Sequence, residues 1–161
     1  MIKYIMAVTV ICLSTLMWMP VPQEGVKSLP QFETIGLTGQ VVTQDIFKHG
    51  GVLHFFRSTC GYCLLEMPSW RIFKRQHPNF KIVLVLHKQT LEEAATYFSS
   101  TTWPFDEVIY DPNDILWQTL DAEYTPQTWL INTDLEAVHK FGVMDIEDFQ
   151  KLDSMIKASL N

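Results

Sequence analysis

Two cysteines separated by two residues are the part of this sequence with the clearest chemical potential. Cys60 and Cys63 enclose Gly61-Tyr62. They follow an apolar run over 52–56 that predicts a buried strand, and they open a stretch over 62–77 with apolar residues at helical spacing. A sulfur in the first turn of a helix lies beside free backbone N–H groups and the positive end of the helix dipole, which favour a thiolate. The pattern therefore predicts a site of thiol–disulfide exchange.

The two sulfurs are expected to have different roles. Cys60, at the start of the helix, is predicted to be the exposed nucleophile, and Cys63, one turn into it, the buried resolving thiol that attacks a mixed disulfide. A zinc site or an inert cross-link are the alternatives. Zinc needs two more ligands at suitable spacing, but the remaining cysteine is Cys12 and the histidines form no paired motif. We therefore expect no metal, and no cofactor beyond the redox-active disulfide itself.

Two charged residues lie close to the cysteines in the sequence. Glu66 follows Cys63 by three residues and so shares its helical face, where a carboxylate would raise a thiol pKa or relay a proton. On spacing alone, an ordinary solvated glutamate is an equal alternative. Arg57 precedes Cys60 by three residues. It would stabilise the thiolate if it points toward the site, and it is a solubility charge if it points away.

Strand and helix patterns alternate downstream of the cysteines. Thr90 is the expected N-cap of the first downstream helix, with acidic residues in its first turn. Strands separated by helices, with a hairpin near the end, predict a three-layer α/β fold. The predicted strands cover 80–86, 107–110, 128–131 and 137–141, and the predicted helices cover 91–100, 111–121 and 145–159.

The N-terminus forms a separate segment. Lys3 precedes an uncharged apolar stretch over 4–21, which is at the short end of what spans a bilayer. The preceding positive charge favours an N-terminus in the cytoplasm and the rest of the chain outside. A cleaved signal peptide and an uncleaved anchor compete, and the lack of a small-residue cleavage pattern favours the anchor. The expected organisation is an anchor over 1–21, a linker over 22–28 and one domain over 29–161.

Composition excludes one class of function. The chain has 161 residues, a net charge of −6 and no basic run, so we expect no nucleic-acid partner. Hydrophobic residues make up 47% of the chain, which is enough for a substantial core.

Five sequence features in this order resemble the thioredoxin superfamily, and within it the membrane-anchored extracytoplasmic branch called TlpA/ResA/CcmG-like, which includes DsbE. The resemblance implies an α/β/α fold with a central mixed sheet, and it covers nearly all of the chain after the N-terminal segment. The features are 29–32 with 38–40, Cys60-Gly61-Tyr62-Cys63, Glu66-Met67-Pro68, Trp103-Pro104 and Tyr124-Thr125-Pro126-Gln127-Thr128.

The resemblance also implies roles for particular residues. The Thr125-Pro126 bond is expected to be cis and to present the Thr125 backbone to an incoming peptide, as an edge strand does. Glu66 is favoured as a proton relay that tunes the thiols. Gly61, Tyr62 and Trp103 are expected to border the substrate groove.

By resemblance, the protein is expected to be an extracytoplasmic thiol–disulfide oxidoreductase, most often a reductase of protein disulfides with a role in cytochrome c maturation. A membrane electron donor of the DsbD/CcdA type would keep it reduced. The implied location is the bacterial cell membrane, with a single-pass anchor and a periplasmic domain, or the periplasm itself if the segment is cleaved.

The sequence departs from the family pattern at the active site, and this keeps alternatives open. Thr59 stands where many members carry Trp, and Gly61-Tyr62 lacks their proline. Thr-Cys-Gly-Tyr-Cys is similar to the active site of DsbC-type isomerases, and the intervening dipeptide tunes redox potential. The alternatives are an isomerase or oxidase, or a non-catalytic thioredoxin-fold module in a secretion or conjugation assembly.

Overall fold

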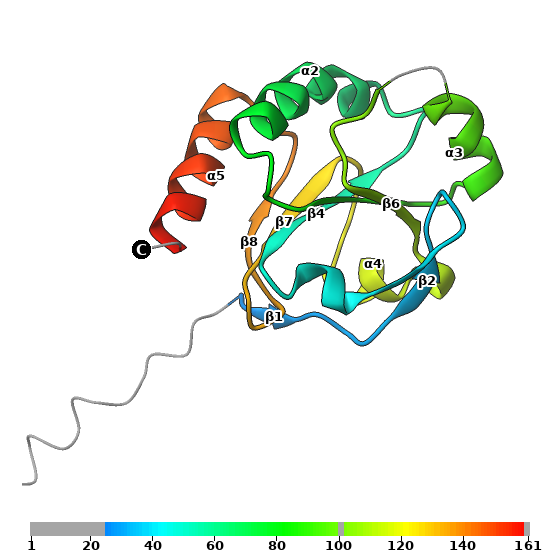
Figure 1. Ribbon diagram of the computed structural model, residues 1–161, viewed down its shortest axis with the longest axis horizontal. Helices are drawn as coiled ribbons and strands as arrows, with labels where there is room; N and C mark the ends of the chain where they lie inside the picture. The colour runs from blue at the N-terminus through cyan, green and yellow to red at the C-terminus, as the bar shows by residue number, and fades with distance from the viewer. Residues whose placement is uncertain (1–24, 100–101, 160–161) are drawn as a thin grey trace, which may run out of the picture.

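Six strands form the central sheet of the computed structural model, which describes residues 25–99 and 102–159 (Figure 1). Their order across the sheet is β1-β8-β7-β4-β5-β6. The three strands β4, β5 and β6 are parallel, and β7, β8 and β1 join them in antiparallel pairs. The strands are β1 (Lys27–Ser28), β4 (Gly51–Phe56), β5 (Ile82–Leu86), β6 (Glu107–Tyr110), β7 (Gln127–Ile131) and β8 (Glu136–Phe141).

A short hairpin precedes the sheet. Its strands are β2 (Glu33–Ile35) and β3 (Val41–Thr43), which pair with each other in antiparallel register. The Leu37 N–H donates to the Val108 carbonyl at 2.8 Å, so the hairpin is attached beside β6 at the far edge of the sheet.

Helices cover both faces of the sheet because its central strands are apolar on both sides. All six residues of β4 are buried; Val52 and Phe56 face one core, and Leu53 and Phe55 face the other. Figure 1 shows α2 and α5 on one side of the sheet and α4 on the other. The first core includes residues of α2 (Gly61–Gln76), α3 (Leu91–Phe98) and α5 (Ile146–Ser159), and the second includes residues of η2 (Gln44–Phe47) and α4 (Ile115–Thr119).

The expected three-layer α/β fold with a central mixed sheet is confirmed. One predicted helix is wrong in detail: 111–121 is not one continuous helix. Asn113 and Asp114 adopt positive φ values of 60° and 54°, which interrupt the helical path. The segment is therefore a 3-10 turn, η3 (Pro112–Asp114), followed by the short α4.

The predicted N-terminal anchor, 1–21, lies outside the described residues. Among the residues that the structure does describe, no helix is both long enough and apolar enough to cross a membrane.

Candidate functional site

The cysteines lie where the central strand β4 passes into α2. After β4 ends at Phe56 the chain turns, and the Cys60 N–H donates to the Arg57 carbonyl at 3.1 Å. Cys60 is the N-cap of α2, and its Sγ accepts a hydrogen bond from the Cys63 N–H at 3.2 Å. The first turn of α2 contains no acidic side chain. The Cys60 sulfur is therefore the group at this helix end that accepts a hydrogen bond from a free N–H group. It also lies at the positive end of the helix dipole.

Cys60 and Cys63 form a disulfide, with their Cα atoms 5.3 Å apart. The redox-active disulfide expected from the spacing is therefore present. The two sulfurs differ in access, because Cys60 is half-buried whereas Cys63 has no exposed surface. A protein thiol or disulfide arriving from solvent can reach Cys60 but not Cys63.

Thr125 lies against the accessible cysteine. The Sγ of Cys60 is 3.3 Å from the Thr125 carbonyl oxygen, although 65 residues separate the two in the chain. The Thr125-Pro126 peptide bond is cis, as the resemblance implied. Thr125 is half-buried and Pro126 is buried. A disulfide sulfur carries no proton, so this approach becomes a hydrogen bond only when Cys60 is a thiol.

Glu66 is a buried carboxyl group, with 3% of its surface exposed. Its Oε1 accepts the Met144 N–H at 2.6 Å and its Oε2 accepts the Trp70 indole N–H at 3.3 Å. Burial raises the pKa of Glu66 to about 7; the two hydrogen bonds oppose the shift, and the nearby Asp148 carboxylate adds to it. The solvated-glutamate alternative is therefore wrong, and the group can gain or lose a proton near neutral pH.

A buried histidine lies behind the helix. The His54 ring packs edge-on against Trp70, with their centroids 5.2 Å apart, and its Nδ1 is 2.8 Å from the Thr128 Oγ1. Burial lowers the pKa of His54 to about 3, so the ring stays neutral. His54 therefore adds no charge beneath α2, where the Glu66 carboxyl group titrates.

The other predicted substrate-binding residues fall into two groups. Gly61 and Tyr62 are exposed on the first turn of α2, next to Cys60, and Tyr62 keeps 62% of its surface accessible. Trp103 is elsewhere: its indole packs on Phe98, with centroids 4.4 Å apart, and its N–H donates to the Phe98 carbonyl.

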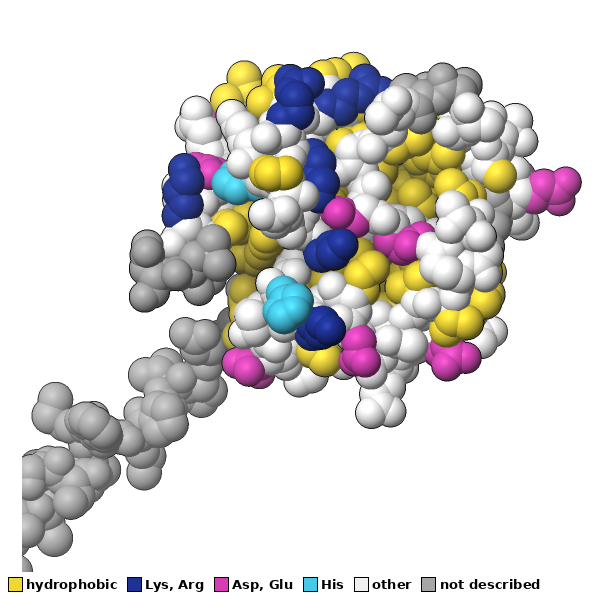
Figure 2. All heavy atoms as spheres, in the orientation of Figure 1, with side chains coloured by type: hydrophobic (Ala, Val, Ile, Leu, Met, Phe, Trp, Pro, Cys, Tyr) yellow, Lys and Arg dark blue, Asp and Glu magenta, His cyan; other side chains and the backbone are white. Residues whose placement is uncertain are grey.

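Trp103 lines a hollow with basic residues of α2, including Arg71 and Arg75, and that hollow does not include the residues around Cys60. Figure 2 shows Lys and Arg side chains gathered over α2.

Sequence reasoning missed the groups that support the site from distant parts of the chain. The Met144 N–H, which fixes Glu66, belongs to the loop between β8 and α5. The Gln89 side chain accepts the Ser58 N–H at 3.0 Å and so ties the loop before Cys60 to the end of β5. Neither contact has a local sequence signal. The side-chain type and the burial pattern suggest a core, but only the packed fold brings these pairs together.

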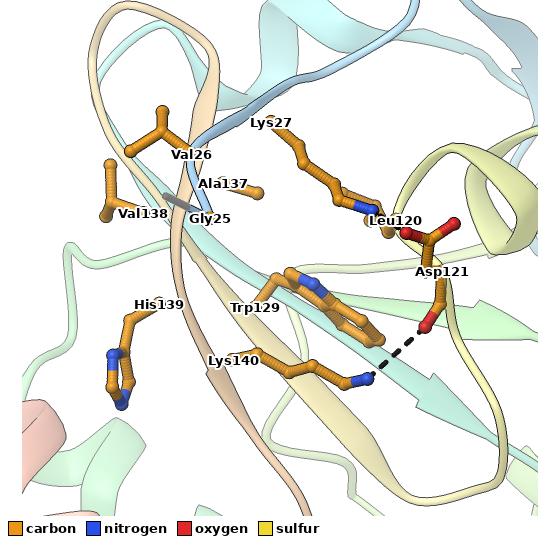
Figure 3. Close-up of a pocket in the computed structure, with 10 residues that line it drawn as sticks. All are labelled: Gly25, Val26, Lys27, Leu120, Asp121, Trp129, Ala137, Val138, His139 and Lys140. Atoms are coloured by element: carbon orange, nitrogen blue, oxygen red, sulfur yellow. Dashed lines mark hydrogen bonds and ion pairs between the residues drawn. The ribbon is translucent and has the colours of Figure 1, made fainter. Parts of the chain in front are cut away.

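Within residues 25–99 and 102–159, no three His, Cys, Asp or Glu side chains are grouped closely enough to hold a metal ion. A separate cavity of about 610 Å³ lies where β1 meets β8 (Figure 3). Trp129 lines it, as do Lys140 and Asp121, and the Lys140 ammonium donates to the Asp121 carbonyl. No cysteine lines this cavity, so it is distinct from the disulfide site.

Comparison with solved structures decides the fold. A protein of Chlorobium tepidum assigned as the thiol:disulfide interchange protein DsbE aligns with a TM-score of 0.74 and 22% identity, over 86% of this chain and 99% of the other. A Bacteroides thetaiotaomicron protein assigned as a protein disulfide isomerase aligns with a TM-score of 0.71 and 22% identity, over 84% and 89%.

The chain has a thioredoxin fold. An exposed lipoprotein thioredoxin of Streptococcus pneumoniae also shares it, with a TM-score of 0.67 and 19% identity over 80% of this chain and 99% of the other. No family model and no curated protein sequence matches the chain. In this thioredoxin fold the disulfide begins the helix that follows the central strand β4, and the cis-proline loop lies against it.

Proposed function

We propose that this protein is an extracytoplasmic thiol–disulfide oxidoreductase that acts on protein substrates through Cys60 and Cys63. The observation that carries the proposal is the asymmetric pair at the N-terminus of α2, with an accessible Cys60 and a fully buried Cys63. Exchange needs one sulfur that a substrate can reach and a second that resolves the intermediate without competing for substrate.

In the reducing direction, the Cys60 thiolate attacks one sulfur of a substrate disulfide. A Cys60–substrate disulfide forms and the other substrate sulfur leaves as a thiolate, which takes up a proton. The Cys63 thiolate then attacks the Cys60 sulfur, forms the Cys60–Cys63 disulfide and releases the second substrate thiolate. Two electrons pass from the protein dithiol to the substrate, and the two protons lost by the cysteines balance those gained by the substrate.

Glu66 is the proposed proton relay for the second attack. Cys63 must lose its proton inside the core, where water does not reach it. Glu66 lies one turn further along the same helical face, and its pKa of about 7 lets it hold a proton at one stage and release it at another. Its two hydrogen bonds, from Trp70 of α2 and from Met144 in the loop before α5, hold the carboxyl group inside the protein.

Apolar surface around Cys60 supports a protein as the substrate. Tyr62 and Leu65 on α2 are 62% and 74% exposed, and Tyr124, next to Thr125, is 48% exposed. Exposed apolar groups beside a reactive atom are typical of a surface that binds another chain. We propose that Gly61, Tyr62, Thr125 and Pro126 contact the substrate backbone near its cysteine. The contacts of Trp103 give no support for including it in this surface.

The direction of electron flow is proposed to be reduction, with a membrane donor of the DsbD/CcdA type and a client such as an apocytochrome c. Fold similarity to a protein assigned as DsbE supports this, and an exposed lipoprotein with the same fold supports a location outside the cytoplasm. The apolar segment over 4–21 is proposed to anchor the chain in the inner membrane.

The reduction potential of the Cys60–Cys63 pair tests the direction. The full-length protein is equilibrated with dithiothreitol or glutathione buffers, and the oxidised fraction is followed by thiol alkylation and mass. A potential near thioredoxin's value of roughly −270 mV, or below it, supports a reductase. A value of roughly −120 to −180 mV, the range of oxidants and isomerases, contradicts it.

The second candidate is an isomerase or oxidase. Gly61-Tyr62 between the cysteines favours it, as does the similarity in fold to a protein assigned as a disulfide isomerase. Refolding of a protein with scrambled disulfides separates the candidates. An isomerase restores the activity of that protein, whereas a pure reductase leaves its cysteines reduced and unpaired.

A further inference from the structure

A small hollow lies directly beside the accessible cysteine. The three residues that precede Cys60, Arg57-Ser58-Thr59, form one wall. The residues that follow β5, Lys88 and Gln89, form the other, and Glu93 of α3 lies at its rim. The cavity has a volume of about 310 Å³, enough for a side chain of a bound peptide but not for a folded element.

Two positive charges meet at this hollow. Burial is the main cause of the lowered pKa of His87, and the nearby Asp114 carboxylate opposes it. Lys88 and Arg57 lower that pKa further, so both cations lie close to the same buried ring. Over the described parts of the chain, 25–99 and 102–159, neither Arg57 nor Lys88 forms an ion pair. Their charges are therefore available to a ligand.

The one negatively charged residue of the lining, Glu93, already accepts a hydrogen bond. The Glu93 carboxylate accepts the Thr90 N–H at 2.9 Å, as part of the capping box at the start of α3. With two cations and one carboxylate, the lining carries one net positive charge on a chain whose net charge is −6. The hollow thus differs in sign from the molecule as a whole.

The walls are held together by hydrogen bonds. Gln89, only 9% exposed, accepts the Ser58 N–H and donates to the Ser58 hydroxyl. The His87 N–H donates to the Phe56 carbonyl at 3.1 Å, which joins the ends of β4 and β5. Because these contacts fix both loops, the backbone positions of Arg57 and Lys88 do not depend on a ligand.

We propose that this hollow is a carboxylate subsite that selects protein substrates with an Asp or Glu near the reactive cysteine. The inference rests on the proposed function, since a substrate sulfur bound at Cys60 places its neighbours over residues 57–59. One wall of the hollow is formed by the three residues that precede Cys60, and an extended chain advances about 3.3 Å per residue; we therefore place the acidic side chain within about three residues of the substrate cysteine. Arg57 and Lys88 bind its carboxylate, and the exposed Thr59 hydroxyl is placed to donate to it.

The test compares cysteine peptides that differ only in charge. Each peptide carries Glu, Gln or Lys two residues before its cysteine, or two residues after it, and its sulfur is activated as a 2-pyridyl disulfide. The reduced full-length protein attacks the peptide sulfur, forms the mixed disulfide and releases 2-thiopyridone, which is followed by absorbance. The ratio of rate constants for the Glu and Gln peptides isolates the subsite, because any change in Cys60 reactivity cancels.

In the better of the two positions, the native ratio is expected to be about three at low salt and to approach one at high salt, as is usual for exposed ion pairs. The Lys peptide is expected to react more slowly than the Gln peptide. The Arg57→Gln/Lys88→Gln double variant should give a ratio near one. Lys48→Gln is the matched control, because Lys48 lies just before β4, at the opposite end of that strand from Cys60, and it should keep the native ratio.

A native ratio of one, or a native ratio that persists in the double variant, overturns the subsite while leaving the oxidoreductase assignment intact. Release of no thiopyridone from any peptide overturns the assignment itself. Glutathione disulfide and its dimethyl ester form a second arm. If glutathione disulfide is preferred over the ester while the peptides react equally, the carboxylate belongs to a small thiol, and the protein-substrate proposal fails. If the double variant does not fold, the salt dependence and the Lys peptide decide the outcome on the native protein.

Discussion

Glu66 shows how burial changes the chemistry of one residue. Three positions after Cys63 the sequence contains a carboxylate, which in water would be fully ionised at neutral pH. In the fold the Glu66 carboxyl group is buried and accepts hydrogen bonds from the Met144 and Trp70 N–H groups, and burial raises its pKa to about 7. The same side chain therefore becomes a group that exchanges a proton within the working range of a thiol.

Glu66→Gln is expected to remove a pH dependence of stability. The folded-state pKa of about 7 lies above the ordinary value of 4.5, so the folded protein binds the proton more tightly. Stability contributed by Glu66 is thus fully present below pH 4.5 and is lost as pH rises to 7. Across that window, the unfolding free energy of the native protein should fall by up to about 3 kcal/mol relative to that of the variant.

Urea titrations of the full-length protein at several pH values measure this difference. Glu92→Gln, an exposed residue in the first turn of α3, is the control and should follow the native curve. Parallel curves for native and Glu66→Gln would show that Glu66 is ionised at the same pH in the folded and unfolded states. The relay role proposed for it would then lose its basis.

Capping interactions decide where the helices begin. Thr90 caps α3 in a capping box with Glu93, and this was predictable because the pattern is local. Asp111 caps α4 differently: its buried carboxylate accepts the Leu116 and Trp117 N–H groups at 3.0 and 2.9 Å, across the irregular residues between. The sequence suggested a helix opening at Asp111 but not the interruption at Asn113 and Asp114, where φ is positive.

Replacement of these two caps by alanine is expected to have unequal effects. Thr90→Ala removes an exposed cap and should lower the unfolding free energy by about 1 kcal/mol. Asp111→Ala leaves two N–H groups without an acceptor in buried surroundings, which should cost about 3 kcal/mol. Thermal or urea unfolding measures both, with Ser154→Ala at an exposed position of α5 as a near-neutral control. Equal losses for the two caps would contradict this account of α4.

The strands and helices that the sequence predicted are those with strong local patterns. The fully buried strands β4 and β5, and α5 with its apolar face, lie within a few residues of the predicted positions. The cysteine pair and the cis-proline loop were recognisable from their motifs. What escaped prediction depends on residues far apart in the chain, such as Met144 with Glu66 and Gln89 with Ser58.

At the scale of the whole molecule, one sheet separates two apolar cores. Ile82 of β5 faces the core under α2 and α5, and Ile131 of β7 faces the core under α4. The two strands have β4 between them, so about 10 Å separates them across the sheet. The disulfide lies where β4 passes into α2, and it packs against the first core, which includes Cys63.

Ile82→Val and Ile131→Val should therefore act independently. Each removes one buried methylene and is expected to lower the unfolding free energy by about 1 kcal/mol. The double variant should lose the sum to within about 0.5 kcal/mol, because the sites share no core. Urea unfolding of the four proteins measures this. A coupling well above that limit would mean that the cores are not energetically separate.

The central claim is that Cys60 attacks the substrate and Cys63 resolves the intermediate. The most direct test is to trap the intermediate with a Cys63→Ser variant of the full-length protein and an oxidised protein substrate, followed by intact mass and peptide mapping. We predict a stable one-to-one adduct through Cys60, and no adduct when Cys60→Ser is used with Cys63 intact. An adduct that forms equally well through Cys63, or no adduct in either variant, would contradict the assignment.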